Sequence, residues 1–316
     1  MRNKTIDTFR GVIMIIMALD HASYFIINTH FYEGFDYIST YPSLLAFLVR
    51  WITHLCAPGF FLVLGYSLYN AYYKKKKLHL LLRGLYLIFL QLTVLNFVWQ
   101  VEPIYIGVIT ILGLSIIILT IIMPLMKKYG LLIGLILIIL GQYIPVTDQF
   151  FIGLLFRPGL YGNIYVLYTL ITWLGIASIG SYLASLEEVP YKLLATISII
   201  VFIIFSFDKA SIKELIIIIK YPPTIRFISL TLAINFLLMC MIDIFKMHFK
   251  PIIILGNEPL FFYIAHLYLY NLMGKIISSN SYTTLFISYL VSFPLLYVLT
   301  KWYHDIKCKR LHFRRD

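Results

Sequence analysis

Long apolar runs separated by short polar stretches dominate this sequence and predict membrane-spanning helices. A helix that crosses a bilayer needs about 20 mostly apolar residues. By this criterion the sequence predicts about ten spans, with no soluble domain and no long linker. They lie near residues 8–27, 52–73, 79–99, 104–124, 130–145, 161–185, 191–207, 225–245, 252–274 and 283–303. The predicted fold class is therefore all-α, a polytopic integral membrane helix bundle that forms a single membrane-embedded domain over residues 1–316.

Three stretches need separate interpretation. Segment 211–220 is apolar but too short to span, so we expect an interfacial or re-entrant piece. Tyr221-Pro222-Pro223 is expected to change the chain direction before the span at 225–245, because proline disfavours helix at the residue before it. Residues 1–27 differ from a signal peptide, because Asp20-His21 interrupts the apolar run and no small-residue cleavage site follows. We therefore expect a transmembrane helix there.

Composition supports a membrane protein, since 61% of the 316 residues are hydrophobic and only 13% are charged. The net charge of +12 lies mostly in short loops, which favours anionic lipid and not nucleic acid as its partner. With an even number of spans, nineteen of the 26 Lys and Arg residues fall on one side and seven on the other. This bias predicts a multi-pass protein of the cell membrane with both termini in the cytoplasm. The three cysteines have no metal-ligand or redox spacing, so we expect no metal site.

The first span carries four ionisable groups, Asp7, Arg10, Asp20 and His21, in an otherwise apolar helix. Such groups are costly at membrane depth and indicate function. The spacing of Asp7 and Arg10 predicts an ion pair, and Gly11 permits close approach of another backbone or a ligand. Arg10 and His21 lie on nearly the same face, roughly 16 Å apart along the helix axis. One end therefore suits an anion anchor and the other a reaction centre, although lipid phosphate and nucleotide phosphate both remain open as partners of Arg10.

Two further histidines lie in predicted spans. Pro58 removes a backbone hydrogen bond to the carbonyl of His54, so the helix is expected to be irregular there. Pro259 suits the first turn of a helix that carries His266 about two turns further on. Under the predicted topology, His21, His54 and His266 all lie in the outward halves of their spans, where histidine is suited to proton transfer. The structural alternatives are an interfacial position for His54 and an interhelical hydrogen bond for His266.

Other acidic and titratable groups could assist these histidines. Asp20 points about 100° away from its neighbour His21, which favours a different partner for the carboxylate. His30, Glu33 and Asp36 lie in the first outer loop, where they could contact a polar substrate or form only a solvated loop.

The motifs that carry these residues occur in a fixed order along the whole chain. They are Asp7-Thr-Phe-Arg10-Gly11 with Ala18-Leu-Asp20-His21, Arg50-Trp-Ile-Thr-His54-Leu-Cys-Ala-Pro58 with Leu64-Gly65, Lys220-Tyr-Pro222-Pro223, Gly256-Asn-Glu-Pro259-Leu-Phe-Phe-Tyr-Ile-Ala-His266, and the tail around Trp302-Tyr303. In this combination the sequence resembles the heparan-α-glucosaminide N-acetyltransferase-like family of membrane acyltransferases, including its bacterial members.

The resemblance implies an enzyme that takes an acetyl group from cytoplasmic acetyl-CoA and delivers it to a sugar or glycan on the far side of the membrane. The candidate residues for such an activity are His54, His21, His266 and Asp20 for catalysis, Arg10, Asp7 and Asn257 for acetyl-CoA, and His30 and Arg226 for the acceptor. The implied partners are acetyl-CoA, the acceptor and membrane lipids, with no nucleic acid and no metal. A homodimer is left open.

One departure from the family leaves the catalytic base and the amino-sugar acceptor open. The resemblance associates the animal enzymes with a histidine in the loop after the first helix, followed by an Asp-x-x-x-Pro motif. Here His54 stands where that aspartate would be, and His30 is only a rough counterpart of the loop histidine. Direct transfer and a covalent acyl-histidine are both compatible with the sequence. Alternative functions are a transporter or flippase for a lipid-linked or small polar substrate, and a binding or assembly protein of the envelope.

Overall fold

The computed structural model describes residues 3–28, 43–99, 104–207, 218–277, 279 and 281–312, with only the backbone of the last two. These residues fold mainly as α-helices, which confirms the predicted helical class. They separate into two compact units. We call them the terminal unit, whose described residues come from 1–31, 40–56 and 237–316, and the central unit, from 57–236.

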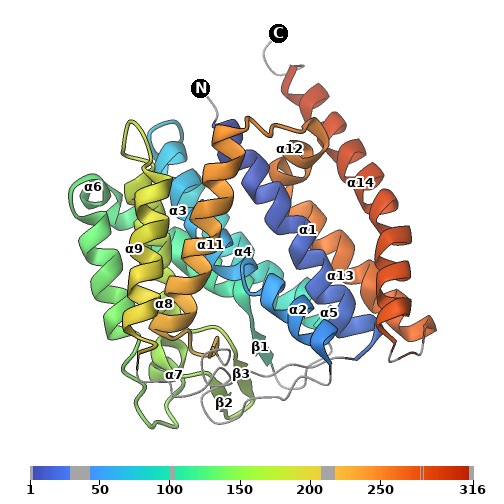
Figure 1. Ribbon diagram of the computed structural model, residues 1–316, viewed down its shortest axis with the longest axis horizontal. Helices are drawn as coiled ribbons and strands as arrows, with labels where there is room; N and C mark the ends of the chain where they lie inside the picture. The colour runs from blue at the N-terminus through green and yellow to red at the C-terminus, as the bar shows by residue number, and fades with distance from the viewer. Residues whose placement is uncertain are drawn as a thin grey trace. The chain divides into compact units, whose positions relative to one another are not determined.

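The terminal unit is built around the first helix. It contains α1 (Lys4–Ile26), α2 (Leu44–Thr53), the end of α11 (Ile225–Ile244), α12 (Lys250–Asn257), α13 (Pro259–Ile276) and α14 (Tyr282–His312). Asn3 caps α1 by accepting a hydrogen bond from the Ile6 amide. Helix α1 contacts α2, α12, α13 and α14, and Figure 1 shows it between helices from the other end of the chain. Its central position explains why Phe9, Ile13 and Met14 are almost completely buried.

The central unit contains the middle helices of the chain. They are α3 (Cys56–Tyr72), α4 (Lys77–Leu90), the π-helix η1 (Gln91–Leu95), α5 (Asn96–Trp99), α6 (Val108–Leu140), α7 (Phe150–Phe156), α8 (Leu170–Leu183), α9 (Tyr191–Ile204) and the first part of α11. Helix α6 packs against α4 and α8. The expected turn at Tyr221-Pro222-Pro223 is confirmed, because Lys220 pairs antiparallel with Pro223 and α11 begins directly afterwards. Residues 211–217 of the predicted interfacial segment lie outside the described residues.

A small sheet in the central unit was not predicted. Strand β3 (Ile164–Val166) pairs parallel with β1 (Ile104–Ile106) and antiparallel with β2 (Gly159–Tyr161). Each strand has only three residues, which is too short for an alternating pattern of apolar and polar residues to be recognised in the sequence. Apolar residues of β1 and β3 were consequently included in the predicted spans at 104–124 and 161–185.

The described residues contain six helices that are long and apolar enough to cross a membrane, or seven if α12 and α13, which meet at 89°, form one broken span. The predicted number of ten is therefore not confirmed. One reason is α6, a single helix of 33 residues that covers two of the predicted spans and contains Pro124. A second reason is that α8 and α9 have only 14 residues each, fewer than a straight crossing needs.

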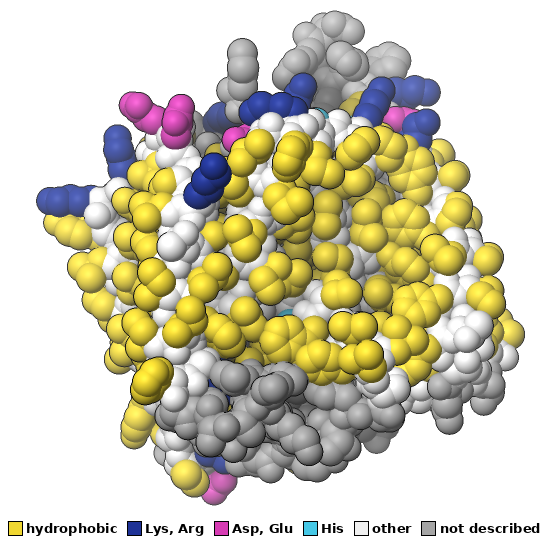
Figure 2. Space-filling view, in the orientation of Figure 1, with side chains coloured by type: hydrophobic (Ala, Val, Ile, Leu, Met, Phe, Trp, Pro, Cys, Tyr) yellow, Lys and Arg dark blue, Asp and Glu magenta, His cyan; other side chains and the backbone are white. Residues whose placement is uncertain are grey.

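The outer surfaces of both units are apolar. Hydrophobic side chains cover the visible sides of α9 in the central unit and α14 in the terminal unit (Figure 2). On α14 the exposed residues include Ile287, Leu290, Val291, Leu295 and Val298. Lys and Arg side chains gather at the α12 end of the terminal unit. A wide apolar surface with cations at its edge is what lipid contact requires, so the chain is a multi-pass membrane protein.

Candidate active site

Arg10 makes two polar contacts near the N-terminus of α1. Its Nη1 atom donates a hydrogen bond of 2.8 Å to the carbonyl oxygen of Gly256 and lies 3.5 Å from Asp7 Oδ1, which confirms the predicted ion pair. Gly256 lies at the end of α12, where unpaired carbonyl groups attract a cation. Asn257 is the next residue, so the three predicted donor-binding residues come from one corner of the terminal unit.

The predicted close approach at Gly11 is also confirmed. A Cβ atom on Gly11 would collide with the carbonyl oxygen of Ile252 in α12, and one on Gly256 would collide with the carbonyl oxygen of Asp7. Two glycines, one on each helix, therefore let the backbones of α1 and α12 touch. This contact brings the start of α13, at Pro259, beside the charged end of α1.

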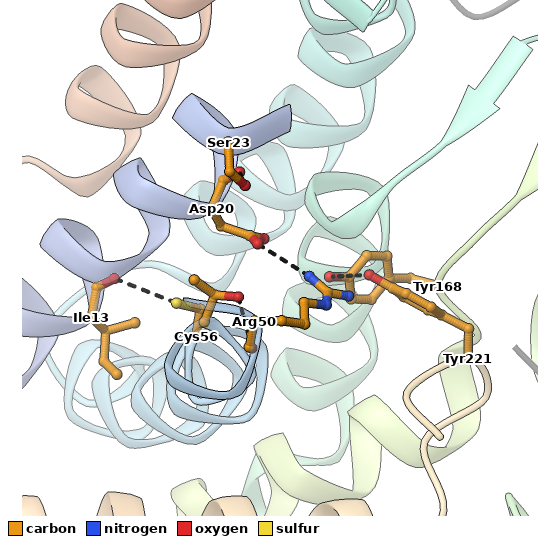
Figure 3. Close-up of polar contacts among 8 residues, drawn as sticks. Ile13, Asp20, Ser23, Arg50, Cys56, Tyr168 and Tyr221 are labelled. Carbon is orange, nitrogen blue, oxygen red and sulfur yellow. Dashed lines mark hydrogen bonds and ion pairs between the residues drawn. The ribbon is translucent and has the colours of Figure 1, made fainter. Parts of the chain in front are cut away.

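Asp20 binds Arg50 of α2. Arg50 Nη1 donates to Asp20 Oδ1 at 3.1 Å, and the two side chains are 7% and 24% exposed (Figure 3). A carboxylate and a guanidinium at this depth compensate each other's charge. The sequence correctly favoured a partner other than His21 for Asp20, but it did not identify Arg50.

His54 lies at a break in the helix, as Pro58 predicts. Helix α2 ends at Thr53 and α3 begins at Cys56, so His54 and Leu55 form a turn between them. The segment runs along α1, because Arg50 contacts Asp20 and Cys56 Sγ lies 3.8 Å from the carbonyl oxygen of Ile13 (Figure 3). The His54 side chain is 1% exposed, so the residue is buried beside the middle of α1.

His21 and His266 form a direct contact in the terminal unit. His21 Nδ1 lies 2.7 Å from His266 Nε2, although the two residues are 245 positions apart in the chain. The rings are nearly parallel, at 8°, with centroids 5.0 Å apart. With the two nitrogens this close, the rings meet at their edges and not face to face. His266 is completely buried, and its Nδ1 lies 2.6 Å from the carbonyl oxygen of Phe262.

Aromatic and hydroxyl groups surround this histidine pair, and the sequence reasoning missed them. Tyr263 meets both imidazole rings edge-on, at centroid distances of 5.7 Å to His21 and 5.6 Å to His266. Tyr270 packs on His266 and accepts a hydrogen bond from Ser292 of α14. Tyr263 and Tyr270 lie three residues before and four after His266, so helical spacing from this histidine is the signal that could have found them.

The structure does not test the two predicted acceptor-binding residues at this site. His30 lies outside the described residues, as do Glu33 and Asp36. Arg226 belongs to the central unit, where its Nε donates to Ser206 Oγ at 3.1 Å. Within the described parts of the chain, no cluster of three or more His, Cys, Asp or Glu side chains could hold a metal ion.

The sequence model of the catalytic domain of heparan-alpha-glucosaminide N-acetyltransferase matches residues 2–193, more than half of the chain. The chain belongs to this family. Comparison with curated proteins finds no match. Family membership implies a membrane acetyltransferase that uses acetyl-CoA as donor. The family match includes Arg10, Asp20, His21 and His54, whereas His266 lies beyond it. The histidine pair therefore joins a family-matched helix to a helix outside the match.

Proposed function

We propose that this chain moves an acetyl group from acetyl-CoA on the cytoplasmic side to a sugar or glycan acceptor on the outer side of the cell membrane. The observation that carries the proposal is the family match, which begins at α1 and includes Arg10 and His21. The buried contact between His21 and His266 supports it, because an imidazole pair can accept and donate a proton near neutral pH.

The donor would bind at the Arg10 end of α1. Arg10, Asp7 and Asn257 lie there together, and a guanidinium has five N–H donors, enough to hold Gly256 and a phosphate oxygen at once. His21 is roughly 16 Å further along the axis, a span that suits the extended arm of coenzyme A. Arg10 also joins α1 to α12 through Gly256, which is a structural alternative to donor binding. We therefore test the Arg10→Ala variant by measuring its binding of acetyl-CoA directly.

In the proposed reaction, an acceptor hydroxyl or amine attacks the thioester carbonyl. The new C–O or C–N bond forms, the C–S bond breaks, and the acceptor proton passes to a histidine and then to the leaving thiolate. His21, His54 and His266 are the candidate bases, with Asp20 acting through Arg50 to hold the α2 segment beside α1. Attack by a histidine nitrogen, to give an acyl-histidine, is the alternative route.

The proposal also assigns the acceptor-binding residues and the orientation of the chain in the membrane. His30 and Arg226 would contact the acceptor on the outer side. Both chain termini would lie in the cytoplasm, where the excess of Lys and Arg favours anionic lipid. One membrane-embedded acyltransferase domain would carry the activity, and two copies could associate as a homodimer.

A transporter or flippase is the second candidate, and the broken pair α12–α13 favours it. The two helices meet at 89°, and helices interrupted at membrane depth line substrate paths in many transporters. Such a protein would move its substrate without breaking the thioester.

The deciding experiment measures transfer of radiolabelled acetyl from acetyl-CoA to glycan acceptors by the purified protein in lipid. We expect His21→Ala and His54→Ala to reduce transfer by at least about 100-fold. Arg10→Ala should instead weaken acetyl-CoA binding. The exposed His79, replaced by Ala, is the matched control and should leave transfer unchanged. Full transfer by both His21→Ala and His54→Ala would contradict histidine catalysis, and no acetyl-CoA binding by the wild type would favour the transporter.

A further inference from the structure

Three groups of the terminal unit form a chain of successive hydrogen-bond contacts: the carbonyl oxygen of Phe262, the ring of His266 and the ring of His21. The oxygen is 2.6 Å from His266 Nδ1, and His266 Nε2 is 2.7 Å from His21 Nδ1. A carbonyl oxygen can only accept a hydrogen bond, so His266 Nδ1 must carry a proton. The protonation state of His266 Nδ1 is therefore determined.

The protonation of the next atom follows from the first. A neutral imidazole has one N–H donor and one acceptor nitrogen, so a neutral His266 accepts at Nε2. A charged His266 would stand completely buried between Phe262, Tyr263 and Tyr270, where an ion loses its hydration. His21 Nδ1 must then be the donor across the 2.7 Å contact, and the lone pair of His21 lies on Nε2.

We propose that His21 Nε2 is the atom that takes the acceptor proton, and that His266 is a positioning residue that holds His21 in this tautomer. The inference rests on the proposed acetyl transfer. When His21 becomes imidazolium, its Nδ1–H continues to donate to His266 Nε2, so proton uptake leaves the hydrogen bond between the two histidines intact. The proton then leaves from the same Nε2 to the departing thiolate, and His266 keeps its own proton throughout.

The packing supports a fixed geometry. Tyr263 meets both rings at angles of 80° and 89°, so one phenol packs edge-to-face against both imidazoles. Helix α13 supplies Phe262, Tyr263 and His266 within about one turn, so a single helix sets the position of the acceptor nitrogen. In a Ser-His-Asp triad, the Asp carboxylate accepts a hydrogen bond from the Nδ1–H of the catalytic histidine. His266 has the same role toward His21, but it is a neutral acceptor.

The first test is direct measurement of the ring protons. In the full chain, labelled with ¹⁵N-histidine and held in lipid nanodiscs, His21→Gln and His266→Gln assign the signals. We expect protonated Nδ1 and unprotonated Nε2 in both residues, with coupling across the hydrogen bond from His21 to His266. A proton on His21 Nε2 would overturn the inference, even in an active enzyme.

The second test compares two substitutions of His266. The Gln side chain can place an acceptor oxygen near the position of Nε2, whereas Leu cannot. We expect His266→Leu to lower kcat by about 100-fold or more with a KM for acetyl-CoA within about twofold, and His266→Gln to retain activity within about tenfold. Equal losses in the two variants would contradict the positioning role.

Matched controls separate this inference from the proposed function. His79→Leu and His79→Gln apply the same substitutions to an exposed histidine of the central unit, and both should keep wild-type kcat. A wild-type protein that transfers no acetyl group to any acceptor overturns the proposed function. The ring-proton measurement still decides the direction of the His21–His266 hydrogen bond in that case.

Discussion

Asp20 and His21 are adjacent in the sequence, but their side chains reach different helices. Asp20 accepts from Arg50 of α2, and His21 contacts His266 of α13. The difference follows from the turn of about 100° per residue in an α-helix. At the scale of single residues, α1 therefore binds one neighbour by charge and another by an imidazole contact, and the two contacts can be tested separately.

Loss of the Asp20 carboxylate should destabilise the terminal unit. Asp20→Ala removes the carboxylate to which the Arg50 guanidinium, 7% exposed, donates a hydrogen bond. We expect a loss of about 1–3 kcal/mol in the free energy of unfolding, because a buried ion pair is broken by removing one member. Thermal unfolding of the protein in detergent measures the change.

The double variant Asp20→Ala with Arg50→Met is the control for this prediction. It removes both charges and keeps much of the side-chain volume, so it should recover part of the stability lost in the single variant. If the double variant is no more stable than Asp20→Ala, the ion pair does not explain the loss.

Some of the candidate site could be predicted at this scale. The Asp7–Arg10 pair and the break at His54 depend on residues within four positions of each other, so local spacing was sufficient. The partners of His21 and Asp20 depend on how α1, α2 and α13 are shifted along their axes relative to one another. Local sequence patterns carry no information about these shifts. The Phe262 carbonyl, a backbone group, has no signature in the sequence at all.

The contact between α1 and α12 is the feature that matters most at the scale of elements. Gly11 and Gly256 each face a backbone carbonyl of the other helix. We predict that Gly11→Ala and Gly256→Ala each lower the free energy of unfolding by about 1–3 kcal/mol, because an added methyl group must push the helices apart. Thermal unfolding in detergent provides the measurement.

Gly159 of β2 is the matched control for these substitutions. A Cβ atom there would meet its nearest neighbour, the ring of Tyr161, at 3.7 Å, an ordinary contact distance. Gly159→Ala should therefore leave the unfolding temperature within the error of the wild type. A similar loss at all three glycines would mean that close packing of α1 on α12 is not the cause.

Apolar runs and prolines predicted most of the helices, and the misses have physical causes. The start of α13 at Pro259 agrees with the expectation, because proline fits the first helical turn. The predicted spans 104–124 and 130–145 put Lys127 and Lys128 in a loop, yet α6 continues through both residues. Polar residues do not end a helix unless they also fail to continue its backbone hydrogen bonds, so composition alone does not place the boundary between two spans here.

At the scale of the whole molecule, the distribution of charge predicts which side of the membrane each end faces. Among the cysteines, Cys56 and Cys240 are buried and Cys308, near the end of α14, is exposed. With both termini in the cytoplasm, a membrane-impermeant maleimide should label Cys308 in inverted vesicles and not in intact cells. Cys308→Ser should abolish the labelling in inverted vesicles. Labelling in intact cells would place this end of α14 outside.

The terminal unit takes its helices from both ends of the chain, and this affects how the protein is made. Gly256 and His266, the partners of Arg10 and His21, follow them by 246 and 245 positions. At roughly 5–20 residues per second, a ribosome needs on the order of 10–50 s to add that length. During this interval Arg10 can pair with Asp7 of α1, but Gly256 and His266 have not yet been made. A nascent chain that has reached residue 193 contains the whole family-matched region, but its histidine pair forms only after α13 has emerged.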